Sequence, residues 1–142
     1  MKKNAKLALA GVLLCIVLLA AFFYPRGGGN VKQAVLVPVE SQLYTEEDIR
    51  DAANTVLGYF KKGFEGCTLT ELRYAGDEAA GQFAEWAEQY QVDEAVVLLS
   101  SFDVDGSGGD GSLNPNYTYK NWGWVLGRSA GGRWELFTCG YG

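Results

Sequence analysis

The feature that most constrains this chain is a long uncharged segment near its N-terminus. Leu7 to Tyr24 is a run of 18 residues without a charge, and three of the six residues before it are lysines. As an α-helix, the run would span about 27 Å, close to the hydrocarbon thickness of a bilayer. We therefore predict that residues 1–26 form an uncleaved signal anchor whose residues 7–24 cross the cell membrane as a single helix. The lysines place the N-terminus in the cytoplasm and the rest of the chain outside.

A cleaved secretory signal is the alternative. Such peptides have a shorter apolar region that ends at a small-x-small cleavage site. The best match, Leu19-Ala20-Ala21, lacks the small outer residue, and Phe22 continues the apolar run. These departures favour the anchor.

The remainder of the chain divides into a linker and one domain. Three consecutive glycines and Pro38 predict a linker over residues 27–42, in which Ala34 to Val39 can alternatively form a short edge strand. Residues 43–142 are long enough for one hydrophobic core. From Val31 onward the chain has 8 lysines and arginines against 17 aspartates and glutamates, a net charge of −9. This charge predicts no nucleic-acid partner.

The domain begins with a predicted amphipathic helix. Thr45 followed by three acidic residues is typical of a helix N-terminus. Apolar residues then recur at spacings of three and four. The stripe is Ile49, Ala53, Val56, Leu57, Phe60 and Phe64. A strand is predicted over Cys67–Tyr74, and Asp77 is the expected N-cap of a second helix that ends near Tyr90.

Three further strands are expected after the second helix. They cover residues 95–104, 117–128 and 133–141, with a glycine-rich loop after the first and the turn Ser129–Gly132 after the second. The fold class is therefore α+β: an N-terminal transmembrane helix, then helices packed on one face of a curved antiparallel sheet of about four strands.

Several stretches are similar to an uncharacterised family of membrane-anchored or secreted ectodomains of gut Firmicutes. They include LYTEEDI from Leu43, LLSSFDVDGSGGDGSLNP from Leu98 and NWGWVL from Asn121. The element order also resembles the cone-shaped fold of nuclear-transport-factor-two-like and cystatin-like proteins. This resemblance implies a fold but no reaction, because the fold supports enzymes, binding modules and spacers alike.

The chain contains no histidine. Its absence excludes Ser-His-Asp and Cys-His catalysis and every histidine-ligated metal site. No cofactor is predicted.

The loop that starts at Asp103 contains a partial calcium-binding pattern. Asp103, Asp105 and Ser107 occupy the first, third and fifth ligand positions of such a loop. The twelfth position is Asn114 instead of the bidentate glutamate. We therefore favour a loop whose side chains bond to its own backbone, with a metal site at these three residues as the alternative.

Two sets of aromatic residues have different predicted roles. Alternation places Trp122 and Trp124 on the face that covers the first helix, so they are expected in the core. Tyr117, Tyr119 and Asn121 then fall on the opposite face, which makes them the ligand-binding candidates.

Cys67 and Cys139 are the cysteines outside the apolar run. An exported compartment permits a disulfide between them, although a simple meander would place them on opposite edge strands. The sequence leaves both the bonded and the free state open.

These observations favour a non-catalytic, membrane-tethered domain that binds an extracytoplasmic protein or a small ligand. The alternatives are a small cone-fold enzyme that uses carboxylates without histidine, and a structural spacer.

Overall fold

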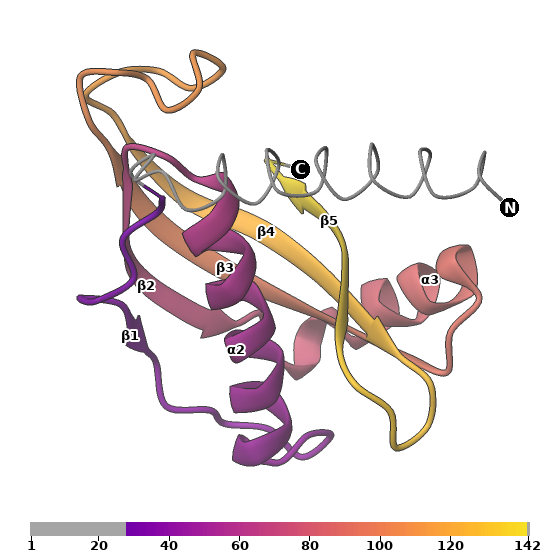
Figure 1. Ribbon diagram of the computed structural model, residues 1–142. Helices are drawn as coiled ribbons and strands as arrows, with labels where there is room; N and C mark the ends of the chain where they lie inside the picture. Colours follow the sequence, from indigo (N-terminus) through magenta and orange to yellow (C-terminus); the bar gives the residue numbers. More distant parts are fainter. Residues whose placement is uncertain (1–27, 142) are drawn as a thin grey trace, which may run out of the picture.

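The computed structural model describes residues 28–141 as an α+β domain with two α-helices and a five-stranded mixed sheet (Figure 1). In chain order the elements are β1 (Val35–Leu36), α2 (Glu46–Gly63), β2 (Cys67–Tyr74), a short 3-10 helix (Asp77–Ala79), α3 (Ala80–Tyr90), β3 (Glu94–Val104), β4 (Thr118–Arg128) and β5 (Glu135–Gly140). The predicted anchor lies outside the described residues. Among residues 28–141, no helix is long and apolar enough to cross a membrane.

The first predicted helix, α2, is confirmed together with its cap. The Thr45 side chain accepts a hydrogen bond from the Asp48 backbone N–H, and the Asp48 carboxylate accepts one from the Thr45 N–H. This capping box satisfies two backbone donors that the helix itself leaves unpaired. Lys61 and Lys62 lie in the last turn, where positive charge is favourable.

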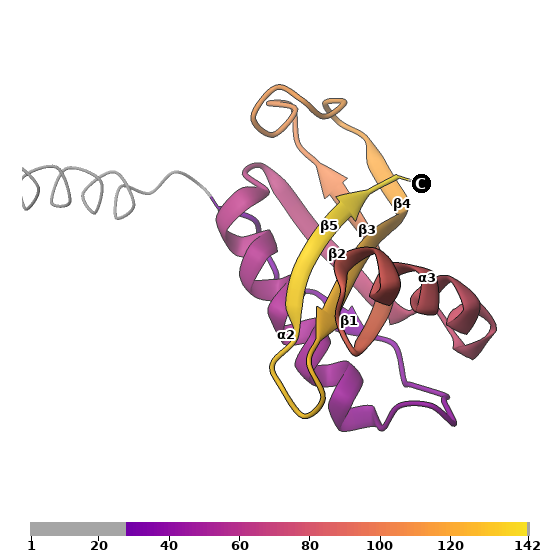
Figure 2. The ribbon, with the colours of Figure 1, turned by 90° about the vertical axis from the view of Figure 1, so that its right-hand side faces the viewer.

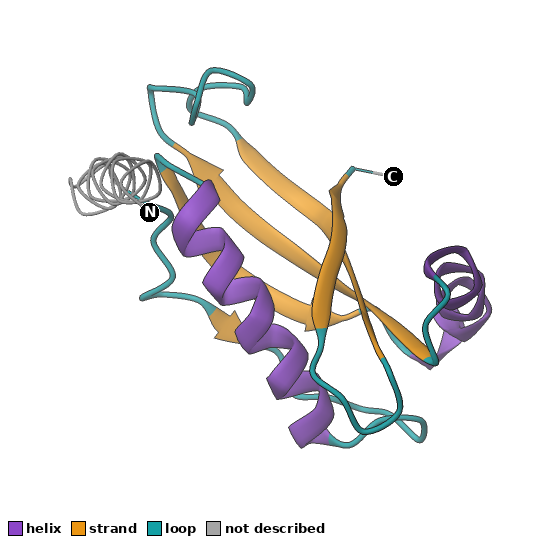
Figure 3. Cartoon of the chain, turned by 45° about the vertical axis from the view of Figure 1, so that its right-hand side comes forward, coloured by secondary structure: helices purple, strands orange, loops and turns teal. Residues whose placement is uncertain are grey.

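The main core lies between α2 and one face of the sheet (Figure 3). Trp124 is fully buried there, with its ring 6.5 Å from that of Phe60. Its indole Nε1 donates a hydrogen bond of 2.8 Å to the Ser100 hydroxyl, so the buried ring has a partner for its polar atom. The expectation that Trp124 packs on the α2 stripe is confirmed.

The sheet differs from the prediction in having five strands and mixed directions. β1 pairs with β2 in parallel, through Val35 with Glu71 and Leu36 with Leu72, and the other neighbours are antiparallel. The edge strand foreseen as an alternative within residues 34–39 is therefore present. The expected linker is instead fastened to the domain, because the Gly29 N–H donates to the Lys61 carbonyl and the Asn30 N–H to the Cys67 carbonyl.

The two helices do not share a face of the sheet, which corrects the predicted two-layer arrangement. On β3, Val96 and Leu98 belong to the α2 face, and Val97 and Leu99 alternate to the other face. Trp86 of α3 lies beside Val97 and Leu99. Figure 2 shows the helices on opposite sides of the sheet. One helix covers one face, and the shorter α3 covers part of the other.

Asp77 does not cap the second helix. Its carboxylate accepts hydrogen bonds from the Ser41 hydroxyl, the Gln42 N–H and the Tyr74 hydroxyl, at 2.6 to 2.8 Å. These bonds hold the pKa of Asp77 below its ordinary value, the Ser41 hydroxyl being the largest cause. Asp77 thus joins the segment before α2 to the end of β2, and α3 begins after a 3-10 turn without a side-chain cap.

Candidate functional site

The face of the sheet opposite α2 contains a cleft of about 290 Å³. Val97, Leu99, Gly123 and Val125 come from β3 and β4 and form its floor. The rest of the lining comes from α3, from a kink in β4 and from the C-terminal part of the chain. These residues are Gln82, Trp86, Asn121, Thr138, Cys139, Gly140 and Tyr141.

Two glycines of β4 explain why the cleft exists. Gly123, Val125 and Gly127 alternate onto this face. In front of Gly127 lies the ring of Phe137, which occupies the space that a side chain there would need. A Cβ added at Gly123, by contrast, would meet only ordinary contacts, with the Gly140 carbonyl oxygen at 3.5 Å and a methyl of Leu99 at 4.0 Å. Phe137 therefore fills the space beside Gly127, whereas no side chain of the described residues fills the space beside Gly123.

An aromatic row forms the α3 side of this face. Phe137 stacks on Tyr90 at a centroid distance of 4.5 Å, and Tyr90 stacks on Trp86 at 5.9 Å. Phe137 is the extra residue of a β-bulge, because Val125 pairs with Thr138 while Leu126 pairs with Leu136. The row fixes α3 on the sheet and leaves the Trp86 ring at the border of the cleft.

Asn121 supplies an oriented amide at the cleft. Its Oδ1 accepts a hydrogen bond from the Arg73 guanidinium. Because arginine is only a donor, the amide oxygen must face Arg73 and the amide NH₂ must point elsewhere. Since Asn121 lines the cleft, this arrangement offers a neutral donor to a bound group.

No carboxylate, lysine or arginine lines the cleft within the part of the chain that the structure describes. Burial raises the pKa of the Cys139 thiol, so this residue is neutral at pH 7. The lining therefore consists of apolar surface with neutral amide and hydroxyl groups, which suits a neutral or apolar ligand group. It offers no carboxylate for the acid–base chemistry considered as an alternative.

The three residues expected to bind ligand are not brought together on one face. Asn121 lines the cleft, whereas Tyr119 is buried, with its ring stacked on Phe102 at 5.2 Å. The cause is a bulge: Ser100 pairs with Trp122 but Phe102 pairs with Tyr119, so β4 has one extra residue there. Asn121 adopts a φ of 58° within this bulge. The bulge reverses the alternation and moves Tyr119 to the core side, so its predicted placement was wrong.

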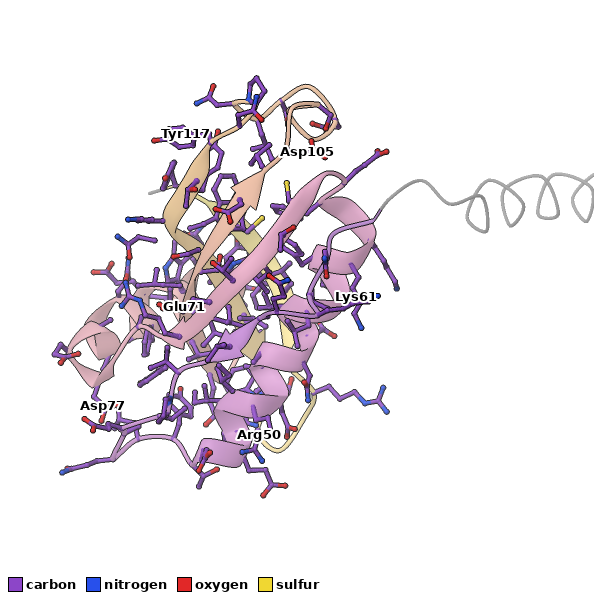
Figure 4. The ribbon with its side chains drawn as sticks, turned by 90° about the vertical axis from the view of Figure 1, so that its left-hand side faces the viewer. Arg50, Lys61, Glu71, Asp77, Asp105 and Tyr117 are labelled. Carbon is purple, nitrogen blue, oxygen red and sulfur yellow. The ribbon has the colours of Figure 1, made fainter. Side chains whose placement is uncertain are left out.

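Tyr117 is exposed and contacts the ring of Tyr119 at 4.9 Å. Figure 4 shows Tyr117 and Asp105 at the end of the molecule where the long loop lies, with Asp77 at the opposite end. Tyr117 does not line the cleft.

The residues of the calcium-like pattern are engaged in local hydrogen bonds. Asp103 accepts from the Thr118 hydroxyl, and Asp105 accepts from both the backbone N–H and the hydroxyl of Ser107. Asp110 and Ser112 repeat the second arrangement. The Ser107 hydroxyl is the largest cause that lowers the pKa of Asp105. Among residues 28–141, no group of three aspartate, glutamate or cysteine side chains gathers so as to hold a metal ion.

Cys67 and Cys139 are free thiols, so the disulfide left open by the sequence is not formed. β3 and β4 lie between their strands. Three strand spacings amount to roughly 14 Å, about twice the largest Cα separation that a disulfide bridges. Burial, followed by the nearby carboxylates of Asp105 and Asp110, raises the pKa of Cys67 to about 11.

Sequence reasoning missed the cleft. The available signal was the pair of glycines in the strand NWGWVLG, since a glycine in a strand often marks the close approach of another group. The position of Phe137 over one of them depends on a bulge that periodicity does not reveal.

A comparison of the chain with protein-family models, with curated proteins and with solved structures found no match. The site must therefore be interpreted from its own geometry.

Proposed function

We propose that this chain is a membrane-tethered extracytoplasmic domain that binds a small ligand or a protein without catalysis, and that the cleft over Gly123 is its binding site. The uncharged run of residues 7–24 supports the tether. The single observation that carries the binding site is the space over Gly123, which is bordered by Trp86 and Asn121 and filled by no side chain of residues 28–141.

The chemistry of the lining supports binding rather than reaction. An aromatic ring beside a neutral amide can hold an apolar or aromatic group by contact and orient it by a hydrogen bond. A general acid or base needs a group that titrates near the working pH within reach of the substrate. Burial raises the pKa of Cys139 in the cleft, and this shift favours the unreactive thiol.

The proposal can be tested with a library of neutral aromatic fragments and the ¹⁵N-labelled full chain in detergent micelles. We expect amide chemical shifts to change at Gly123, Val125 and Thr138. Gly123→Val should abolish these changes, because its side chain fills the cleft floor. Gly58→Val is the matched control: it also adds a side chain to open space, but on α2. Fragments that bind elsewhere, or that bind Gly123→Val equally well, would overturn the proposed site.

A further inference from the structure

The sheet has two edges of very different character. On one side, β1 has two residues and is soon followed by Pro38, which lacks a backbone N–H. On the other side, β5 has six residues without proline or lysine, and among residues 28–141 its neighbour in the sheet is β4 alone. Natural sheets protect their edges with short strands, proline and charge, and β5 has little of this protection. Figure 2 shows β5 at the open edge of the sheet.

The open edge adjoins the cleft. Thr138, Cys139 and Gly140 belong to β5 and also line the cleft. The bulge at Phe137 lies before this segment and leaves it paired regularly, through Val125 with Thr138, Trp124 with Cys139 and Gly123 with Gly140. In an antiparallel pair, every second backbone N–H and C=O of an edge strand points outward. A strand added to β5 would therefore find backbone partners, and every second side chain of it would lie on the face of the sheet that contains the cleft.

The negative charge of the domain indicates which kind of peptide would add to β5. Residues 28–141 contain 8 lysines and arginines against 17 aspartates and glutamates. Arg50, Arg73 and Arg128 each have a carboxylate partner, which leaves still less free positive charge. The helix beside the cleft, α3, contains Glu85 and Glu88 but no basic residue. An acidic surface attracts basic partners and repels acidic ones.

We propose that β5 accepts an extended basic peptide segment as a sixth strand, and that one apolar side chain of this segment enters the cleft over Gly123. Backbone hydrogen bonds to β5 would supply affinity, and the cleft would select the apolar residue, as in other cases of strand addition. Lysines or arginines two positions before or after this residue would project to the same face and lie near the acidic α3. This inference rests on the proposed function, since it names the occupant of the same site.

The test is selection of random heptapeptides, displayed on phage, against the full chain in detergent. We expect enriched peptides to contain a bulky apolar residue with basic residues two positions before and after it. Their affinity should fall at least tenfold for Gly123→Val and stay unchanged for Gly58→Val. Synthetic versions methylated on alternate backbone nitrogens should lose binding in one register and keep it in the other, because every second N–H points to β5.

Three results would overturn the inference: no enrichment, equal affinity for Gly123→Val, or no effect of N-methylation in either register. The fragment experiment separates these failures from failure of the proposed function. If fragments bind over Gly123 and peptides do not, the cleft binds ligands but its occupant is not a peptide strand. If neither binds, the binding site itself is wrong.

Discussion

The ring of Phe137 occupies the position that a side chain on Gly127 would need. Phe137 reaches this position because it is the extra residue of the bulge in β5, and it is held there by stacking on Tyr90 of α3. Gly127 thus leaves room for the ring that joins β5 to α3. Gly123, four residues earlier on the same face, has no aromatic ring of residues 28–141 in front of it, and the cleft begins there.

The two glycines should consequently respond in opposite ways to alanine. Gly127→Ala forces Phe137 to move and should lower the free energy of unfolding by about 1–3 kcal/mol, as overpacking does. Gly123→Ala meets only ordinary contacts, and the lost flexibility of the unfolded chain should raise stability by about 0.5–1 kcal/mol. Urea denaturation of the two variants measures both effects. Equal destabilisation by both would contradict the assignment of filled and open space.

Removing the buried aromatic residues of the α2 face should lower the free energy of unfolding more than Gly127→Ala does. Trp124→Ala should destabilise the domain by about 3–5 kcal/mol and leave it largely unfolded. Tyr119→Ala should also cost more than about 2 kcal/mol, because the ring is buried and its hydroxyl accepts from the Asn114 N–H. Thermal denaturation followed by circular dichroism measures the stability of both variants. Tyr59→Ala is the control, because Tyr59 is exposed. A stable Tyr119→Ala variant would place that ring outside the core.

Tyr119 also illustrates how far the sequence predicts this fold. Periodicity identified α2 and its cap at Thr45, the bounds of β2, and the burial of Trp124, because these depend on local pattern and on one uninterrupted register. The face of Tyr119 depends on a single extra residue at the β4 bulge, and such an insertion leaves no periodic trace. The cleft was missed for the same reason, since it arises from bulges and from the side of the sheet that α3 covers.

The buried thiol of Cys67 should make stability depend on alkaline pH. Its pKa is raised from about 9 in the unfolded chain to about 11 in the folded domain. Between these values the unfolded chain has lost this proton and the folded domain has kept it, so the free energy of unfolding falls as the pH rises. The contribution is fully present below pH 9. Cys67→Ala should show a shallower decline between pH 9 and 11 in urea titrations, and parallel curves would contradict the assigned burial.

Calcium should have little effect on stability. The carboxylates of Asp105 and Asp110 already accept hydrogen bonds within their own turns, and the twelfth loop position is Asn114. Millimolar calcium should therefore leave the melting temperature of the full chain unchanged relative to magnesium. A calcium-specific rise in melting temperature that Asp103→Ala and Asp105→Ala abolish would contradict this prediction and support the metal site that the sequence offered as an alternative.

The uncharged run of residues 7–24 predicts that the chain stays in the membrane fraction after an alkaline carbonate wash. Deleting residues 7–24 should release it to the supernatant. An N-terminus near Phe22 in the mature protein would show a cleaved signal instead of an anchor.

If the anchor is present, the end of α2 that carries Lys61 must lie close to the bilayer. Gly29 is hydrogen-bonded to Lys61, and from Tyr24 to Gly28 the chain can span at most about 14 Å. Arg50 lies eleven residues earlier on α2, roughly 16 Å farther away along the helix axis. Labels at Lys61→Cys and Arg50→Cys in a cysteine-free chain compare the two positions in vesicles. A headgroup quencher should quench the Lys61 label more strongly, and equal quenching would contradict this orientation.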